Sequence, residues 1–329
     1  MEGMSTTDPS ADGTGARTPE TSLSVTFAGH STVLIDAGGV RLLTDPLLRR
    51  RIGVLIRRTA LPATALRRDL DAVLISHAHL DHLDVPSLRM IGRETPVIVP
   101  RGVGPLLRRQ GFDPTEVDVG DEVELPLRPP ERAAAAGAPR ATVRAVPAYH
   151  SGTRYPLGTP SAALGYVVTG AGLSAYFAGD TGLFDGMEDI GPVDIAVLPV
   201  GGWGPRLPDD HLGPLSAARA LQLLRPRACV PVHWGTLYPP WLPPEVNAKW
   251  SEWPRAFDRY ARHLAPDVDM RVLPPGETAI FTHEALARTT PRAAPAAPQP
   301  AATPRDERPA APQPSATPPD PAPWPEAGP

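Results

Sequence analysis

The chain has 329 residues, a hydrophobic content of 41% and a formal net charge of −4, which suit one large globular domain and give no overall attraction to nucleic acid. Its single cysteine, Cys229, excludes a disulfide framework and favours a reducing compartment. No apolar run reaches the roughly 20 residues that span a bilayer, and residues 1–20 lack the basic start and apolar stretch of a signal peptide, so we expect a cytoplasmic protein.

The two ends of the chain differ in composition from its middle. Residues 1–20 are polar, and the segment from Pro291 onward consists almost entirely of Pro, Ala, Gln and Thr with a few charges. Such segments have no apolar face to bury, so we predict disordered tails at 1–20 and 284–329, flanking one domain at 21–283. A plain solvated extension is our main interpretation of the C-terminal tail, and a Pro-rich ligand for a partner domain is the alternative.

Short strands and turns open the predicted domain. Apolar runs at 23–27, 32–36 and 40–44 are separated by glycine turns, which predicts an antiparallel meander. Beyond residue 71 strands alternate with helices, apart from a low-complexity segment at 129–140 that we interpret as a surface loop. The strands are predicted at 72–75, 96–99, 122–125, 142–146, 163–168, 173–178, 193–199, 228–232 and 270–273, with a last one after 277, and the helices at 86–92, 102–110, 215–225 and 254–264. This alternation predicts an α/β fold.

The segment directly after the predicted strand 72–75 is rich in metal-ligating side chains. It contains three of the nine histidines of the chain together with two aspartates. These side chains are His77, His79, Asp81, His82 and Asp84. The spacing of His77 and His79 can direct two imidazoles at one cation while Asp81 and His82 point elsewhere, so two adjacent metal sites are expected. A solvated polar loop is the alternative, but it gives no reason for so many histidines.

Three more candidate ligands occur later in the chain. His150, Asp180 and His233 each come just after one of the predicted strands. Polar residues at strand ends gather at one edge of a layered α/β fold, where sites are built. Taken alone, either histidine could be a structural residue and Asp180 could cap a turn. Beside the segment 77–82, we interpret all three as metal ligands.

Together these segments resemble the metallo-β-lactamase superfamily. The likeness is closest to the branch of N-acyl-phosphatidylethanolamine phospholipase D and its bacterial relatives, and it covers roughly residues 23–281. The matching motifs are Gly-His-Ser-Thr at 29–32, Leu-Thr-Asp-Pro at 43–46, Ser-His-x-His-x-Asp-His at 76–82, Val-Pro-Ala-x-His at 146–150, Phe-Ala-Gly-Asp-Thr-Gly at 177–182 and His-Trp-Gly-Thr at 233–236. The resemblance implies a four-layered αββα sandwich with two zinc ions between its sheets.

The resemblance also assigns the metal ligands. The implied ligands are His77, His79 and His150 for the first ion, Asp81, His82 and His233 for the second, and Asp180 as the bridge between them. Imidazole and carboxylate groups suit zinc, and no thiolate lies nearby to form a closed structural site. Such ligands leave a position open on each ion, where a bound water has a pKa of about 7 instead of 15.7. The implied chemistry is hydrolysis by metal-bound hydroxide.

Three further residues are expected around the ions. His211 occupies the position where the phospholipase D branch has a histidine near the substrate phosphate, so it is a candidate for stabilising the transition state or protonating the leaving alkoxide. Asp45 and His30 are expected to hold a ligand imidazole in one tautomer. The alternatives are a surface residue before a helix for His211 and ordinary turn residues for Asp45 and His30.

Two groups of residues bear on substrate and surface contacts. The run 47–58 mixes arginines with large aliphatic residues, so it is a candidate for contact with an anionic membrane surface or a lipid-like substrate. A loop packed by its aliphatic side chains is the plainer interpretation. Four tryptophans follow the last predicted ligand, and we interpret them mainly as packing residues, with an entrance to the site as the alternative. They are Trp234, Trp241, Trp250 and Trp253.

The ligand set and His211 lead to one main hypothesis. The protein is a dinuclear zinc hydrolase, with Asp81 and His211 as catalytic residues, that cleaves a phosphodiester in a phospholipid or related small molecule. A lactonase of the ascorbate-6-phosphate type and an iron-dependent oxidoreductase on the same fold are the alternatives. A nucleic-acid substrate is not expected, since no clamp domain or long basic segment is visible. The oligomeric state is left open.

Overall fold

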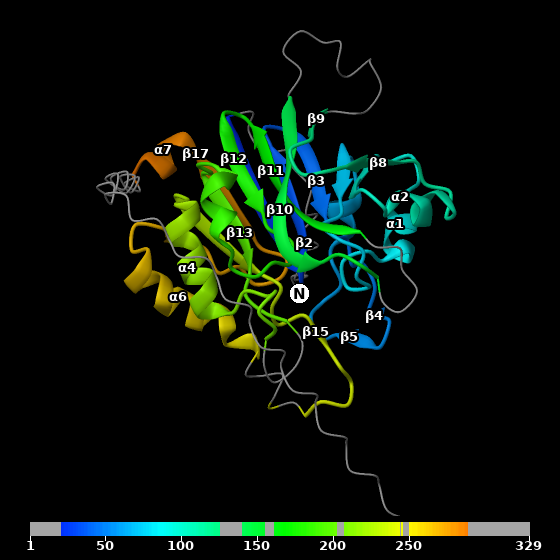
Figure 1. Ribbon diagram of the computed structural model, residues 1–329. Coiled ribbons are helices and arrows are strands. Elements are labelled where there is room, and N and C mark those ends of the chain that lie inside the picture. Colours follow the sequence, from blue (N-terminus) through cyan, green and yellow to red (C-terminus); the bar gives the residue numbers. More distant parts are fainter. Residues whose placement is uncertain are drawn as a thin grey trace, which may run out of the picture. The chain divides into compact units, whose positions relative to one another are not determined.

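The computed structural model describes residues 21–125, 140–154, 161–202, 207–243, 245 and 250–288 (Figure 1). The chain divides into two units, Met1–Arg292 and Ala293–Pro329, and all described residues belong to the first. The predicted tail 1–20, the C-terminal tail beyond 288 and the loop expected at 129–140, apart from residue 140, lie outside the described residues. Within the described ranges, no helix combines the length and the apolar character needed to cross a membrane.

The predicted meander is confirmed and forms part of a seven-stranded sheet with the order β17-β1-β2-β3-β6-β7-β8. β1, β2 and β3 pair antiparallel, whereas β6, β7 and β8 extend the sheet in parallel. The sequence pattern misses β8 because its centre, Thr115 and Glu116, is polar. The bounds are β1 (Ser22–Gly29), β2 (Thr32–Ala37), β3 (Val40–Thr44), β6 (Ala72–Leu74), β7 (Val97–Pro100), β8 (Pro114–Val117) and β17 (Thr278–Thr282).

A second seven-stranded sheet has the order β16-β14-β13-β12-β11-β10-β9. Its strands β9 to β12 pair antiparallel, and β12, β13, β14 and β16 run parallel. Because parallel strands end at the same edge, residues that follow β12, β13 and β14 come close together. The bounds are β9 (Glu122–Leu125), β10 (Ala141–Ser151), β11 (Ala162–Gly170), β12 (Leu173–Phe177), β13 (Ile195–Pro199), β14 (Ala228–Val232) and β16 (Asp269–Met270).

The apolar faces of the two sheets pack against each other. Leu23, Val25 and Phe27 alternate along β1 toward this core, and Ile195 and Val197 of β13 face it from the other sheet. Helices cover both outer faces (Figure 1). They are α1 (Val85–Ile91) and α2 (Gly104–Arg108) on the first sheet, and α4 (Pro214–Leu224) and α6 (Trp253–Leu264) on the second. The order helix, sheet, sheet, helix confirms the predicted αββα sandwich.

Residues 47–58 form a hairpin of a small third sheet. β4 (Arg51–Ile52) pairs with β5 (Leu55–Arg57), which pairs in turn with β15 (Leu237–Tyr238). Leu47 and Ile52 are buried with Leu237. The plainer interpretation of this run, packing by its aliphatic side chains, therefore holds for its first half.

The C-terminal boundary of the domain lies beyond residue 283. α7 (His283–Ala287) follows β17 directly, and the Ala285 backbone N–H donates a hydrogen bond of 3.1 Å to the Thr282 side chain. Leu286 is 1% exposed and packs in the core between the sheets. The tail predicted from residue 284 therefore starts too early, because one buried leucine and a helix cap hold this turn. Two 3-10 helices, at Thr64–Arg67 and Asp185–Ile190, complete the described elements.

Candidate metal centre

Strand ends and turns bring the predicted ligands to one edge of the two sheets. The segment 77–82 follows β6, Asp180 follows β12 and His233 follows β14. His150 differs from the prediction, since it lies inside β10 where the pairing with β11 becomes irregular. His30 reaches the same edge from the turn between β1 and β2, with a positive φ of 58°.

The first group of ligand atoms comes from His77, His79 and His150, as predicted for the first ion. Nε2 of His77 lies 3.0 Å and Nε2 of His150 lies 3.2 Å from Nδ1 of His79. Burial lowers the pKa of all three imidazoles. They are therefore neutral near pH 7, which is the form that binds a metal ion.

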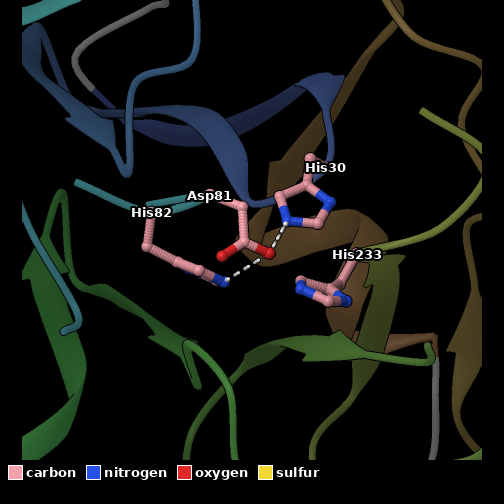
Figure 2. Close-up of side chains that lie close together, drawn as sticks. All are labelled: His30, Asp81, His82 and His233. Atoms are coloured by element: carbon pink, nitrogen blue, oxygen red, sulfur yellow. Dashed lines mark hydrogen bonds and ion pairs between the residues drawn. The ribbon is translucent and has the colours of Figure 1, made fainter. Parts of the chain in front are cut away.

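The second group joins Asp81, His82 and His233, as predicted, with His30 as a fourth member (Figure 2). The Asp81 Oδ2 atom lies 3.2 Å from Nε2 of His30 and 4.0 Å from Nε2 of His82. The rings of His30 and His233 are 3.9 Å apart between centroids. Figure 2 shows these four side chains pointing toward one another from three separate segments of the chain.

Asp180 lies between the two groups. Its Oδ2 atom is 3.2 Å from Nε2 of His82 and 3.2 Å from Nε2 of His233. A further set of ligand atoms within 4.8 Å of one another comprises His77, His82 and Asp180, so this carboxylate is shared by both groups. The position is the one expected of the predicted bridge.

Asp45 orients the His82 imidazole through the Nδ1 atom of that ring. Its Oδ2 atom lies 2.8 Å from Nδ1 of His82, and its two oxygens accept hydrogen bonds from the backbone N–H and the hydroxyl of Ser76 at 2.8 and 2.6 Å. Because the Ser76 hydroxyl donates to Asp45, its oxygen is left to accept from Nδ1 of His77 at 2.9 Å. Nε2 of His77 then carries the lone pair that a metal needs. Although burial opposes the charged form, Asp180 and then Asp45 raise the pKa of His82, so Nε2 of His82 would have to lose a proton to a binding cation. Ser76 is part of the motif at 76–82, but the sequence pattern did not predict this role for it.

His30 contacts the candidate ligands directly. Burial, followed by the proximity of His233, lowers the pKa of His30 to about 3, so its ring is neutral. Against the desolvation cost, the hydrogen bond from His30 keeps the pKa of Asp81 well below its usual range. A neutral ring facing an ionised carboxylate must donate, so the proton of His30 is on Nε2. This contact matches the orienting role predicted for His30, with a carboxylate in place of an imidazole.

His211 approaches the centre from the loop before α4. Its Nε2 atom lies 3.5 Å from Oδ2 of Asp180, and its Nδ1 atom lies 2.8 Å from Oδ1 of Asp210. Although burial opposes the charged form, Asp180 and then Asp210 raise the pKa of His211 to about 9. Nδ1 of His150 lies 3.1 Å from the Asp210 backbone carbonyl oxygen and 3.1 Å from the other Asp210 carboxylate oxygen. Asp210 therefore links His211 to a candidate ligand, and its position next to His211 is the only sequence signal that pointed to it.

Two glycines let this loop come close. A Cβ atom on Gly182 would lie 2.1 Å from the Asp209 carbonyl oxygen, and one on Gly202 would lie 3.1 Å from Cδ2 of His211. The first contact is too short for any side chain. Gly182, the last residue of the Gly-Asp-Thr-Gly motif, thus allows the loop that carries His211 to approach the strand end that carries Asp180.

The donor atoms of the centre fit divalent metal ions. Among the described residues, Oδ1 of Asp180 and Nε2 of His82 are buried without a hydrogen bond of acceptable geometry. Buried polar atoms without partners are rare, and a cation between the two groups would supply the missing partner. The donors are imidazole nitrogens and carboxylate oxygens, which suit zinc and related ions. The only cysteine, Cys229, is buried in the core under α4 and α6.

The tryptophans after His233 have different surroundings. Trp250 is 7% exposed and stacks on Tyr238 with 5.8 Å between ring centroids, which confirms a packing role. Trp234, Trp250 and Trp253 also line a pocket that reaches His30 and His233. Trp241 is 67% exposed and belongs to neither environment.

The chain is similar to a known protein family and to several known proteins. The family model described as "Beta-lactamase superfamily domain" matches residues 40–234 of this chain. N-acyl-phosphatidylethanolamine-hydrolyzing phospholipase D 1 of Caenorhabditis elegans is 33% identical over 244 residues, which cover 67% of this chain and 65% of the worm protein. A metal-dependent hydrolase of Opitutus terrae is 31% identical over 77% of this chain and 98% of its own length. The chain spans less than two thirds of the worm protein and 59% of an uncharacterized Mycobacterium tuberculosis relative.

Solved structures show the same fold. Igni18, a metallo hydrolase from Ignicoccus hospitalis, is 28% identical, and the match covers 79% of this chain and 99% of that protein with a TM-score of 0.59. The diiron β-hydroxylase CmlA from Streptomyces venezuelae, at 20% identity and a TM-score of 0.55 over 80% of this chain, shares the fold alone.

Proposed function

The chain belongs to the metallo-β-lactamase superfamily. We propose that it is a metal-dependent hydrolase that uses two zinc ions to cleave a phosphodiester bond in a phospholipid or a related small molecule. In this proposal His77, His79 and His150 hold the first ion. Asp81, His82 and His233 hold the second, and Asp180 contacts both. When bound, the ions supply an activated water and neutralise charge on the substrate oxygens.

The observation that carries the phosphodiester is the position of His211 between Asp180 and Asp210. With Asp210 on its Nδ1 atom, its Nε2–H is directed at the shared carboxylate Asp180 and hence at the space where substrate would lie. A cation with a donor hydrogen suits the two anionic oxygens of a phosphodiester better than a neutral lactone. His211 stabilises the negative charge on the phosphoryl oxygens and gives its Nε2 proton to the leaving alkoxide. The name of the worm relative supports this substrate class.

Asp81 and His30 act together in the proposed site. The Nε2–H of His30 donates a hydrogen bond to Asp81 and orients this carboxylate toward His82 and His233. Asp45 and Ser76 fix the rings of His82 and His77 in the same way. These fixed side chains keep the ligand geometry constant during the reaction.

The test combines metal analysis with a substrate panel. Protein purified without added metal is analysed for zinc, iron and manganese, stripped with a chelator and reloaded with each metal in turn. Each form is assayed with bis-p-nitrophenyl phosphate, N-acyl-phosphatidylethanolamine and a panel of lactones. We expect two zinc ions per chain and cleavage of the phosphodiesters. Intact phosphodiesters together with an opened lactone, or activity only with iron, would overturn the proposal.

A further inference from the structure

The hairpin of β4 and β5 carries a basic surface with exposed apolar side chains. Residues 47–68 contain seven arginines and no acidic residue, in a chain whose net charge is −4. At the hairpin tip, Val54 is 61% exposed. Two more exposed apolar residues from other segments are Leu80 at 51% and Trp241 at 67%. We call Arg50, Arg51, Val54, Arg58, Leu80 and Trp241 the hairpin surface.

The five arginines between residues 49 and 58 divide into two kinds. Arg49 forms a bidentate pair with Asp84, with N–O distances of 2.6 and 2.8 Å. Arg57 is 0% exposed and donates to backbone carbonyl groups. By contrast, Arg50, Arg51 and Arg58 are exposed, and none of them forms an ion pair with any residue in the described ranges. These three charges are available to an external anion.

The hairpin surface adjoins the metal centre. A Cβ atom on Gly53, in the hairpin turn, would lie 3.7 Å from the Leu80 side chain. Leu80 stands between His79 and Asp81, two of the proposed metal ligands. Trp241 comes three residues after Tyr238, which pairs with Ile56 of β5. Leu80 therefore lies beside the hairpin turn and within the metal-binding segment, and Trp241 shortly follows the strand that pairs with the hairpin.

From this arrangement we propose that the hairpin surface docks on the anionic surface of a lipid bilayer. Arginines attract anionic headgroups, while an exposed tryptophan and exposed aliphatic side chains enter the boundary between headgroups and acyl chains. A nucleic-acid backbone would satisfy the arginines but would leave Val54 and Leu80 in water, so the mixture of charge and apolar surface favours the bilayer. Docking in this orientation brings the metal centre to the headgroup phosphates. This orientation adds to the proposed function and depends on it. Vesicle binding itself can be measured without hydrolysis of any substrate.

Vesicle binding is tested with the full chain. The protein is first stripped of metal, so that it cannot hydrolyse the vesicle lipids. Sedimentation is compared for vesicles of phosphatidylcholine alone and of phosphatidylcholine with phosphatidylglycerol. We expect binding to the anionic vesicles only, weakened by salt because screening shortens from about 10 Å at 0.1 M to about 3 Å at 1 M. The triple variant Arg50→Ser, Arg51→Ser, Arg58→Ser should bind about 100-fold more weakly, at about a fivefold loss for each arginine. Val54→Asp should weaken binding about tenfold.

Matched controls separate this surface from overall charge. Ile280 is 61% exposed, like Val54, but lies on β17, so Ile280→Asp should leave vesicle binding unchanged. A second triple variant, Arg255→Ser, Arg262→Ser and Arg271→Ser, removes the same number of exposed charges elsewhere and should also bind normally. Equal losses from both triple variants would overturn the proposal.

Two further outcomes count against the docking surface. One is absence of sedimentation with anionic vesicles, and the other is binding of a DNA duplex through Arg50, Arg51 and Arg58 without vesicle binding. Hydrolysis of soluble bis-p-nitrophenyl phosphate is measured separately. Vesicle binding without hydrolysis would overturn only the proposed function, and hydrolysis without vesicle binding would overturn only the docking.

Discussion

At the scale of single residues, buried hydrogen bonds between polar groups hold the candidate ligands. Asp45 is 0% exposed, and desolvation raises its pKa although His82 and Ser76 oppose this effect. A buried carboxylate costs free energy unless donors surround it, as they do here. We infer that the protein has a carboxylate at this buried position because Asp45 orients the ring of His82, a proposed zinc ligand.

Replacing Asp45 by Asn keeps the side-chain size but exchanges an acceptor oxygen for an amide donor. We expect zinc affinity to fall about 10- to 100-fold because His82 loses the group that fixes its tautomer. Calorimetric titration of zinc into the stripped protein measures this. Asp36→Asn is the control, since Asp36 is 2% exposed and contacts Gly39 and Arg41. Equal zinc affinity in the two variants would contradict the role of Asp45.

Replacing Asp210 by Asn tests the link between His150 and His211. We expect kcat for bis-p-nitrophenyl phosphate to fall about 10- to 100-fold, with a smaller change in KM, because the amide lacks the carboxylate charge that supports His211 and leaves only one side-chain oxygen for the two imidazoles. Zinc affinity should fall as well, which a role confined to substrate contact would not cause. The neighbouring Asp209→Asn is the control, because the Asp209 side chain is exposed. A variant with normal kcat and normal zinc affinity would remove Asp210 from the site.

Asp81→Ala removes a proposed ligand and the acceptor of the His30 hydrogen bond. Turnover should fall by about 1,000-fold or more, with the loss of one zinc ion per chain. Circular dichroism checks that the sandwich still folds. Full activity in the folded variant would exclude Asp81 from the mechanism.

At the scale of elements, a buried arginine connects the small sheet to the first large sheet. Arg57 of β5 donates to the carbonyl oxygens of Leu47 at 2.6 Å and of Ala28, the residue two before His30, at 3.3 Å. Gly29, with a φ of +104°, makes room for it, since a Cβ atom there would lie 2.6 Å from the guanidinium. Burial lowers the pKa of Arg57 to about 10. The hairpin thus supports the turn that carries His30.

Arg57→Leu should lower the free energy of unfolding by about 2–4 kcal/mol, because buried carbonyl groups lose their donors. Urea unfolding followed by circular dichroism measures the loss. Arg58→Leu, at an exposed neighbouring position, should change stability by no more than about 0.5 kcal/mol. Similar small effects for both variants would show that Arg57 does not hold the hairpin.

At the scale of the whole molecule, the candidate ligands come from both sheets. His30 and the segment 77–82 belong to the first sheet, while His150, Asp180 and His233 belong to the second. Bound ions would therefore tie the sheets together at one edge.

Removal of metal should destabilise the whole sandwich. A ligand at 100 times its Kd adds about 2.7 kcal/mol to stability, so chelation should lower the melting temperature by several degrees. Differential scanning calorimetry with and without zinc measures this shift. Asp81→Ala should show a smaller shift because it holds fewer ions. An identical melting temperature for the loaded and stripped protein would argue that the ions do not bridge the sheets.

The amino-acid sequence by itself determined the layered fold, the meander and the chemical type of the site, because periodic apolar patterns and closely spaced histidines are local features. Tertiary structure alone decided that Asp210 contacts His150, 60 positions away, that Ser76 links His77 to Asp45, and that Arg57 is buried while Arg58 is not. These contacts depend on how loops from separate strands meet and on which side chains lose water. No local pattern encodes either, since both follow from the packing of the complete sandwich.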